Sequence, residues 1–248
     1  MPHYELSGPP DAPVVVLGNS LGTTTRLWDR QLPLLHRRFR VLRYDHRGHG
    51  GSAAPPGPYR VDDLADDVLE LLDTLGLARV SYCGVSMGGM VGMWLAGHAP
   101  ERIERLVLCC TAAGFPSARP WLERAAAVRG SGTGSVAPSV VGRWFTPAFR
   151  ERSPEVVAAF EAELSEVDDE GYAGCCEALA AADLRSVLPA IEAPTAVVAG
   201  VADSATPPEC GRFVAESVPG ASFHLVPGAH LANVEAADAV SAILERHL

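Results

Sequence analysis

A serine between two glycines at residues 84–88 has the residue types and the spacing that nucleophilic catalysis uses. Residues 80–91 begin as an apolar, β-leaning run, pass through Gly-x-Ser-x-Gly and continue as an apolar helical run. A strand that turns sharply into a helix needs small residues on both sides of the bend, because the two backbones nearly touch, and Gly84 and Gly88 supply that room. Ser86 then stands at the tip of the turn, above the helix N-terminus. We therefore predict that Ser86 is a nucleophile; the alternative is a glycine-rich turn with an idle serine.

A nucleophilic serine needs a base, and the base needs an acid that orients it. In an open parallel sheet, functional groups gather where the strands end, at their C-terminal edge. Of the eight histidines, His230 follows the last predicted strand, in a glycine-bearing loop. His46 and His49 also follow a strand and are its competitors. We predict His230 as the base, because the chain order then also fits a Ser…Asp…His hydrolase.

The orienting acid is sought in the loops that follow strands. The loop at residues 111–114 has no carboxylate, whereas the loop at residues 200–207 contains Asp203. We predict Asp203 as the acid, with a helix or turn cap as the alternative role. Asp45 lies beside Arg47 and several glycines and has the features of a residue that fixes a loop.

Attack on a carbonyl carbon places negative charge on its oxygen, and backbone N–H groups can stabilise that charge, each by about 3 kcal/mol. One such donor is expected from Met87, directly after the nucleophile. The other is expected from the loop after the first apolar strand, with Leu21 as the preferred residue.

Strands and helices alternate on both sides of a helical segment. Through about residue 115 this alternation predicts a mostly parallel sheet with helices on both faces. Between about 115 and 183 no strand-like run occurs, and a flexible hinge is expected at residues 130–135. The predicted fold is α/β, with a core domain at residues 1–115 and 186–248 and an all-helical cap at 116–185. Strands are expected at residues 14–17, 39–44, 80–85, 103–110, 195–199 and 222–226, and helices at about 28–35, 62–75, 86–98, 121–128, 153–164, 172–182 and 235–248.

Composition and net charge limit the classes of molecule that the protein can be expected to bind. The 248 residues suffice for one large core or a core with an insertion, and the net charge of −10 argues against binding to nucleic acid or to an anionic membrane. No apolar run approaches the roughly 18 residues of a membrane helix, and residues 1–5 lack the basic and apolar segments of a signal peptide, so a cytoplasmic location is expected.

The six cysteines show no spacing typical of a metal site or of a disulfide framework. All basic residues are arginine, which excludes a lysine Schiff base, and we expect neither metal nor organic cofactor. A small-molecule substrate is expected, and a homo-oligomer is left open.

Several motifs together resemble a known family. The chain resembles the α/β hydrolases over essentially its whole length, with a helical cap. Residues 44–52, Tyr-Asp-His-Arg-Gly-His-Gly-Gly-Ser, resemble the family's strand-end signature, whereas residues 19–22, Asn-Ser-Leu-Gly, stand where most relatives carry His-Gly. Residues 19–22, 84–89 and 142–149 together resemble 3-oxoadipate enol-lactonases. This resemblance implies opening of a small lactone ring that bears a carboxylate, in the β-ketoadipate pathway of aromatic catabolism.

A carboxylate-bearing substrate requires a local cation in an acidic protein, and a bidentate arginine suits a carboxylate. Arg143 in the cap segment is the first choice and Arg124 the second; the alternative for each is a solvated cap residue. Trp144 is expected to wall the pocket or to anchor the cap.

Other functions of the same fold stay open. A carboxylesterase, a carbon–carbon bond hydrolase and a cofactor-free haloperoxidase share the Ser-Met-Gly-Gly elbow, so the triad does not discriminate among them. Haloalkane dehalogenases and epoxide hydrolases are disfavoured because they place aspartate at the elbow. A non-catalytic ligand-binding protein of the same fold is the alternative from another class.

Overall fold

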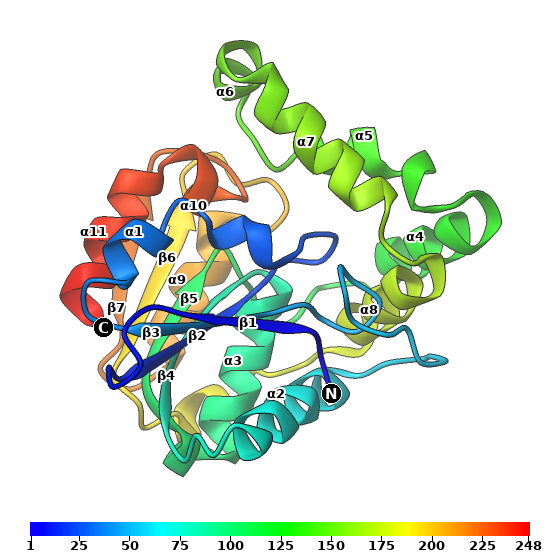
Figure 1. Ribbon diagram of the computed structural model, residues 1–248. Coiled ribbons are helices and arrows are strands. Elements are labelled where there is room, and N and C mark those ends of the chain that lie inside the picture. Colours follow the sequence, from blue (N-terminus) through cyan, green and yellow to red (C-terminus); the bar gives the residue numbers. More distant parts are fainter.

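Seven strands form one sheet in the computed structural model, which describes residues 1–248 (Figure 1). The strand order is β1-β3-β2-β4-β5-β6-β7, and every neighbouring pair is parallel except β1 with β3. The mostly parallel α/β sheet predicted from the sequence is therefore confirmed. The strands are β1 (Tyr4–Ser7), β2 (Val14–Gly18), β3 (Arg40–Tyr44), β4 (Val80–Val85), β5 (Ile103–Cys109), β6 (Thr195–Gly200) and β7 (Ser222–Val226).

Helices cover both faces of this sheet. In Figure 1, α1 and α11 lie on one side of the strands and α2 and α3 on the other, and α3 packs directly on β2, β4 and β5. None of the helices is both long and apolar enough to cross a membrane. The helices of the core are α1 (Leu32–Leu35), α2 (Val61–Thr74), α3 (Met87–His98), α9 (Pro208–Ser217), α10 (Ala232–Glu235) and α11 (Ala237–His247), with short 3-10 turns η1 (Thr25–Trp28), η2 (Pro100–Arg102) and η4 (Leu188–Ala190).

A helical insertion separates β5 from β6, as predicted. Helix α4 packs closely on α8, while α5, α6 and α7 extend beyond the end of the sheet (Figure 1). An isolated bridge between Gly114 and Asp183 joins the two ends of the insertion. The limits at residues 116 and 185 stay a prediction. The elements of the insertion are α4 (Arg119–Ser131), η3 (Thr133–Ser135), α5 (Ala137–Val141), α6 (Pro147–Arg152), α7 (Pro154–Ser165) and α8 (Asp169–Ala181).

The structure corrects several local expectations. The segment expected to be a flexible hinge, residues 130–135, instead ends α4 and forms η3. Hydrogen bonds explain this difference, because the Thr133 N–H donates to the Asp169 carboxylate at 2.7 Å and the Thr133 hydroxyl donates to the Val167 carbonyl at 3.1 Å. The helix expected at residues 28–35 is a 3-10 turn followed by the four-residue α1, and the C-terminal helix is interrupted at Ala236. Strand β1 and helices α5, α6 and α9 had not been predicted.

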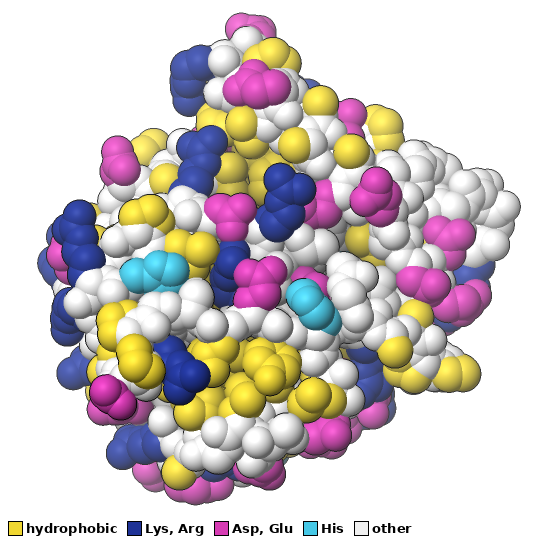
Figure 2. Space-filling view, in the orientation of Figure 1, with side chains coloured by type: hydrophobic (Ala, Val, Ile, Leu, Met, Phe, Trp, Pro, Cys, Tyr) yellow, Lys and Arg dark blue, Asp and Glu magenta, His cyan; other side chains and the backbone are white.

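The cap contacts the core at places far apart in the sequence. A Cβ atom on Gly48 would lie 2.3 Å from the Gly171 Cα atom, so only two glycines permit this approach of α8 to the loop after β3. The Thr24 N–H donates to the Glu163 carboxylate of α7 at 2.7 Å. Acidic and basic side chains are interspersed over the face shown in Figure 2, so this face carries no broad basic surface.

Gly84 offers a direct test of how closely β4 and α3 approach. A Cβ atom at this position would lie 2.2 Å from the Gly88 carbonyl oxygen. We predict that Gly84→Ala lowers the free energy of unfolding by about 1–3 kcal/mol, because the backbone must shift to relieve the clash. Gly130→Ala is the matched control, because a Cβ atom there meets nothing within 4 Å and alanine favours a helix by up to about 1 kcal/mol. Urea denaturation measures both variants, and equal losses of stability would contradict the prediction.

Candidate active site

Ser86 lies between β4 and α3 with a backbone that few L-residues adopt. Its φ is 55° and its ψ is −113°, a conformation that costs about 1–3 kcal/mol and persists only where the surroundings hold it. The Ser86 N–H donates to the Cys109 carbonyl at 2.9 Å, and the Ser86 carbonyl accepts from the Thr111 hydroxyl at 2.7 Å. The end of β5 therefore holds the strained turn from both sides of the residue.

His230 and Asp203 form a buried pair at the ends of β7 and β6. The His230 Nδ1 atom lies 2.9 Å from Asp203 Oδ2. The same carboxylate accepts from the Ala205 N–H at 2.8 Å, the Thr206 N–H at 3.0 Å and the Thr206 hydroxyl at 2.8 Å. Burial alone would raise the pKa of Asp203, but the charge and hydrogen bond of His230 and the Thr206 donors outweigh it, so this pKa lies below its ordinary value. An ionised Asp203 keeps the proton on Nδ1 and leaves Nε2 of His230 free to accept one.

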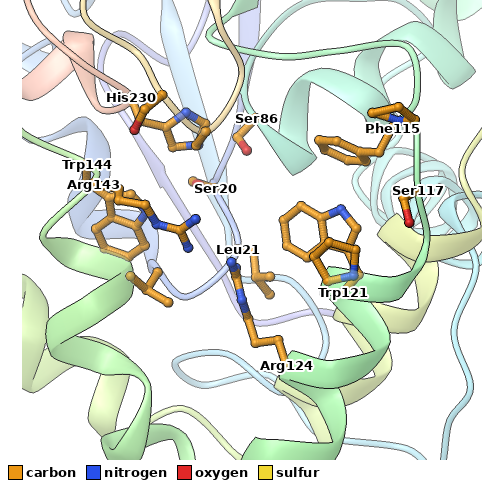
Figure 3. A pocket seen from close by; sticks show the side chains of 15 residues that line it. Ser20, Leu21, Ser86, Phe115, Ser117, Trp121, Arg124, Arg143, Trp144 and His230 are labelled. Atoms are coloured by element: carbon orange, nitrogen blue, oxygen red, sulfur yellow. The ribbon is translucent and has the colours of Figure 1, made fainter.

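Ser86 and His230 face the same cavity, which has a volume of about 250 Å³ (Figure 3). No hydrogen bond joins their side chains in this structure; such catalytic bonds often tighten only when substrate binds. Asp203 stands behind His230, away from the cavity. The lining residues come from both the core and the cap: Ser20, Leu21, Ser86, Phe115, Pro116, Ser117, Pro120, Trp121, Arg124, Val140, Arg143, Trp144, Ser204, Ala205 and His230.

The predicted oxyanion donors meet beside Ser86. Neither the Leu21 N–H nor the Met87 N–H donates a hydrogen bond within the protein; Leu21 lines the cavity and Met87 directly follows Ser86, and their role as oxyanion donors stays a prediction. The loop that carries Leu21 is held in place, because the Asn19 carbonyl accepts from the Gly88 N–H at 2.9 Å. Helix α3 thus connects directly to the loop after β2.

His46 and His49, the competing bases, bind this loop instead of facing the cavity. His46 Nε2 lies 3.0 Å from the Asn19 carbonyl, and His49 Nε2 accepts from the Gly22 N–H at 2.9 Å. Burial, together with the neighbouring His49, lowers the pKa of His46 to about 3, and burial lowers the pKa of His49 as well. Both imidazoles are therefore neutral near pH 7, and their role is to support the loop.

Asp45 binds the neighbouring loops, as expected of a loop-fixing residue. Its carboxylate accepts from the Thr25 N–H at 2.8 Å and from the Gly51 N–H at 3.0 Å. It therefore joins the segment after β2 to the segment after β3 and does not reach the cavity.

Arg124 and Arg143 both line the cavity, and neither forms an ion pair with a carboxylate of the protein. Figure 3 shows both guanidinium groups directed toward the space in front of Ser86. Burial lowers the pKa of Arg143, and the like charge of the nearby Arg124 lowers it further. The Tyr172 hydroxyl is buried near them; burial raises the pKa of Tyr172, and the charges of Arg124 and Arg143 partly oppose that shift. Two guanidinium groups without a carboxylate partner therefore lie in the wall of this cavity.

Aromatic rings form the other walls. Trp144 is 3% exposed and meets Phe160 edge-on, with 6.0 Å between ring centroids. Trp121 lies under the Arg124 guanidinium at 4.6 Å from the ring centroid and packs on Phe115. Trp144 thus both lines the cavity and anchors the cap, the two roles expected for it.

Some residues of this site had not been predicted. Ser20, Phe115 and Trp121 line the cavity, and Thr111 and Thr206 support Ser86 and Asp203. Thr206 could have been found from its position three residues after the predicted acid. Phe115 and Trp121 carry no sequence signal, because only the cap's packing brings them to Ser86.

No cysteine side chain lines the cavity. Five of the six cysteines are buried, and burial raises the pKa of the Cys110 and Cys175 thiols. No group of three or more His, Cys, Asp and Glu side chains is arranged to hold a metal ion.

The sheet, the serine turn and the Asp–His pair define the class of protein, an α/β hydrolase. The family model described as alpha/beta hydrolase fold matches residues 13–141, and the chain belongs to this family. It is 41% identical to 3-oxoadipate enol-lactonase 2 of Acinetobacter baylyi, over 98% of this chain and 93% of that protein. Within the family it is therefore a hydrolase of the enol-lactonase group.

Solved structures agree with this placement. The enol-lactonase from Burkholderia xenovorans LB400 superposes with a TM-score of 0.97 at 44% identity, covering 98% of this chain and 95% of that one. A thermophilic esterase from Thermogutta terrifontis with malate bound superposes with a TM-score of 0.93 at 28% identity, covering 98% and 91%. The superposition thus includes the helical cap of this chain and extends over nearly the full length of both relatives.

The role of Ser86 can be tested by covalent labelling. We predict that a fluorophosphonate probe labels Ser86, and that Ser86→Ala abolishes the labelling and lowers ester hydrolysis by at least about a thousandfold, because the attacking oxygen is lost. Ser135→Ala, at an exposed serine of η3, is the control and should behave as the unaltered protein. Mass spectrometry locates the label; full activity in Ser86→Ala would exclude an acyl-enzyme.

The buried neutral histidine predicts a pH dependence of stability. The unfolded chain binds a proton at His46 below about pH 6.5, whereas the folded chain does so only near pH 3. Stability is therefore lost as the pH falls from 6.5, and we expect His46 to account for about 2 kcal/mol between pH 7 and pH 5. His46→Gln keeps a donor for the Asn19 carbonyl but does not titrate. Urea denaturation at pH 7 and pH 5 measures the free energy of unfolding of both proteins. Between these pH values His46→Gln should lose about 2 kcal/mol less than the unaltered protein, and an equal loss would show that His46 is not the buried neutral histidine responsible.

Proposed function

We propose that the protein hydrolyses a small lactone that carries a carboxylate, and that its substrate is 3-oxoadipate enol-lactone, which it opens to 3-oxoadipate in the β-ketoadipate pathway. The observation that carries the proposal is the pair of arginines without ion-pair partners in the same cavity as Ser86. The likeness to the enol-lactonases supports it.

The proposed reaction proceeds through an acyl-enzyme. His230, oriented by Asp203, takes the Ser86 proton while the serine oxygen attacks the lactone carbonyl carbon. The N–H groups of Leu21 and Met87 stabilise the negative oxygen of the tetrahedral intermediate. The ring oxygen then leaves, receives the proton from His230 and becomes an enol, which tautomerises to the ketone. A water molecule gives a proton to His230 and attacks the acyl carbon, and Ser86 recovers its proton as the acid is released.

The arginine pair gives the substrate a reason to enter an acidic protein. Transfer of a carboxylate from water to a half-buried site is costly unless charged donors replace the lost hydration. Arg124 and Arg143 together supply such donors and at the same time lose their mutual repulsion when an anion lies between them. Malate, a small dicarboxylate, is bound by the Thermogutta esterase, which supports the choice of a carboxylate-bearing ligand.

The cap walls complete the proposed site. Trp121, Trp144 and Phe115 give the cavity apolar surface for a short carbon skeleton.

Substitution of the two cavity arginines tests whether the substrate carries a carboxylate. We predict that Arg143→Met and Arg124→Met each raise KM for the enol-lactone by about tenfold or more, because each removes a charged hydrogen-bond donor worth at least about 1.5 kcal/mol. Hydrolysis of a neutral aryl ester should change much less. Arg150→Met, at an exposed arginine of α6, is the control. Steady-state kinetics on both substrates measures this, and equal rates of the unaltered protein on lactone and aryl ester would undo the lactonase assignment while leaving the hydrolase one.

A further inference from the structure

One carboxylate, that of Glu235 at the end of α10, joins the cap to the loop that carries His230. Its Oε2 atom accepts from the Ala229 N–H and from the Thr146 N–H, both at 3.1 Å. Its Oε1 atom accepts from the Thr146 hydroxyl. Ala229 directly precedes His230, and Thr146 directly precedes the first residue of α6.

A second link lies on the other side of His230. The Leu231 N–H donates to the Trp144 carbonyl at 3.0 Å. The residues before and after His230 are thus both bound, one directly and one through Glu235, to the segment that we call the cap arm, residues 143–146. Arg143, at the start of the cap arm, lines the same cavity as His230.

The Glu235 side chain is closely packed, and its backbone donors have no alternative acceptor. Gly228 has a φ of 115°, and a Cβ atom there would lie 3.4 Å from Glu235 Cγ, so the loop folds closely over the glutamate side chain. Two of the three donors are backbone N–H groups of segments without regular structure. They have no other acceptor in the protein, and leaving them buried and unpaired would cost free energy.

We propose that Glu235 is a positioning residue that fixes the distance between the cap arm and the His230 imidazole, and thereby selects the number of carbon atoms between a substrate's carboxylate and its reactive carbonyl. This inference rests on the proposed function, in which Arg143 binds the carboxylate and His230 serves the carbonyl. A rigid link between these two groups makes only one substrate length productive, since misplacement by about 1 Å can cost a hundredfold in rate.

The test uses para-nitrophenyl monoesters of succinic, glutaric, adipic and pimelic acids, each compared with the neutral ester of the monocarboxylic acid of equal length. The ratio of kcat/KM for the anionic ester to that for the neutral ester measures the carboxylate's contribution at each length. We expect this ratio to peak at one length in the unaltered protein. In Glu235→Leu we expect the ratio at the preferred length to fall at least about fivefold, because KM for the preferred anionic ester rises. For the neutral esters we expect kcat to fall and KM to stay unchanged.

Conservative and control variants separate positioning from folding. In Glu235→Gln the amide oxygen can accept both N–H groups and the amide nitrogen can donate to the Thr146 hydroxyl oxygen, so we expect most of the peak to return. Glu245→Leu, at an exposed glutamate of α11, should leave the ratio as it was. If Glu235→Leu does not fold, Thr146→Val, which removes one donor on the cap side, must lower the peak in the same direction, whereas Thr146→Ser must not.

The outcomes distinguish this inference from the proposed function. An unchanged peak in Glu235→Leu, or an equal loss in Glu235→Gln, overturns the positioning role. A ratio near one at every length in the unaltered protein overturns both the positioning role and the carboxylate site, whereas a ratio that is equally high at every length overturns only the positioning role. A peak that depends on Glu235, together with no activity on the enol-lactone, upholds the positioning role and overturns only the choice of substrate.

Discussion

The backbone of Ser86 occupies a conformation that costs free energy, and the fold around it is arranged to hold that conformation. Gly84 lets β4 and α3 approach to a distance that no Cβ atom would permit, and Gly88 likewise lets α3 approach the end of β2 at Gly18 and Asn19. The end of β5 then binds the turn through the Cys109 carbonyl and the Thr111 hydroxyl. Because the cost is offset by the packing of a buried sheet, the hydroxyl can stand exposed in the cavity without the turn relaxing.

Support for the cavity comes from polar groups that never reach it. Two neutral imidazoles, His46 and His49, hold the loop that supplies an N–H beside Ser86. Four donors surround the Asp203 carboxylate and keep it ionised behind His230. Each of these buried groups is hydrogen-bonded to the loops around it, so it adds rigidity where an unpaired polar group would add a penalty.

The cap supplies what distinguishes this hydrolase from others with the same sheet. Its two arginines place positive charge in the cavity of a protein whose net charge is −10, and its rings close the walls. The same cap is bonded to the loop of the proposed base through Glu235 and Leu231. In the proposed reaction, the residues that recognise the substrate and the residues that act on it thus belong to parts of the chain that are joined by hydrogen bonds.

The sequence alone determined the sheet's parallel strands, the helical insertion and the serine turn, because local periodicity and paired glycines encode them directly. It also identified His230 and Asp203, since both follow strands whose ends must meet at one edge. It missed β1, whose four residues are too short to show a pattern, and the splitting of the last helix at Ala236. Only the tertiary structure decided that Arg124 and Arg143 share one cavity and that Glu235 connects cap and core, because these contacts join residues about 20 to 90 positions apart through packing that no local pattern records.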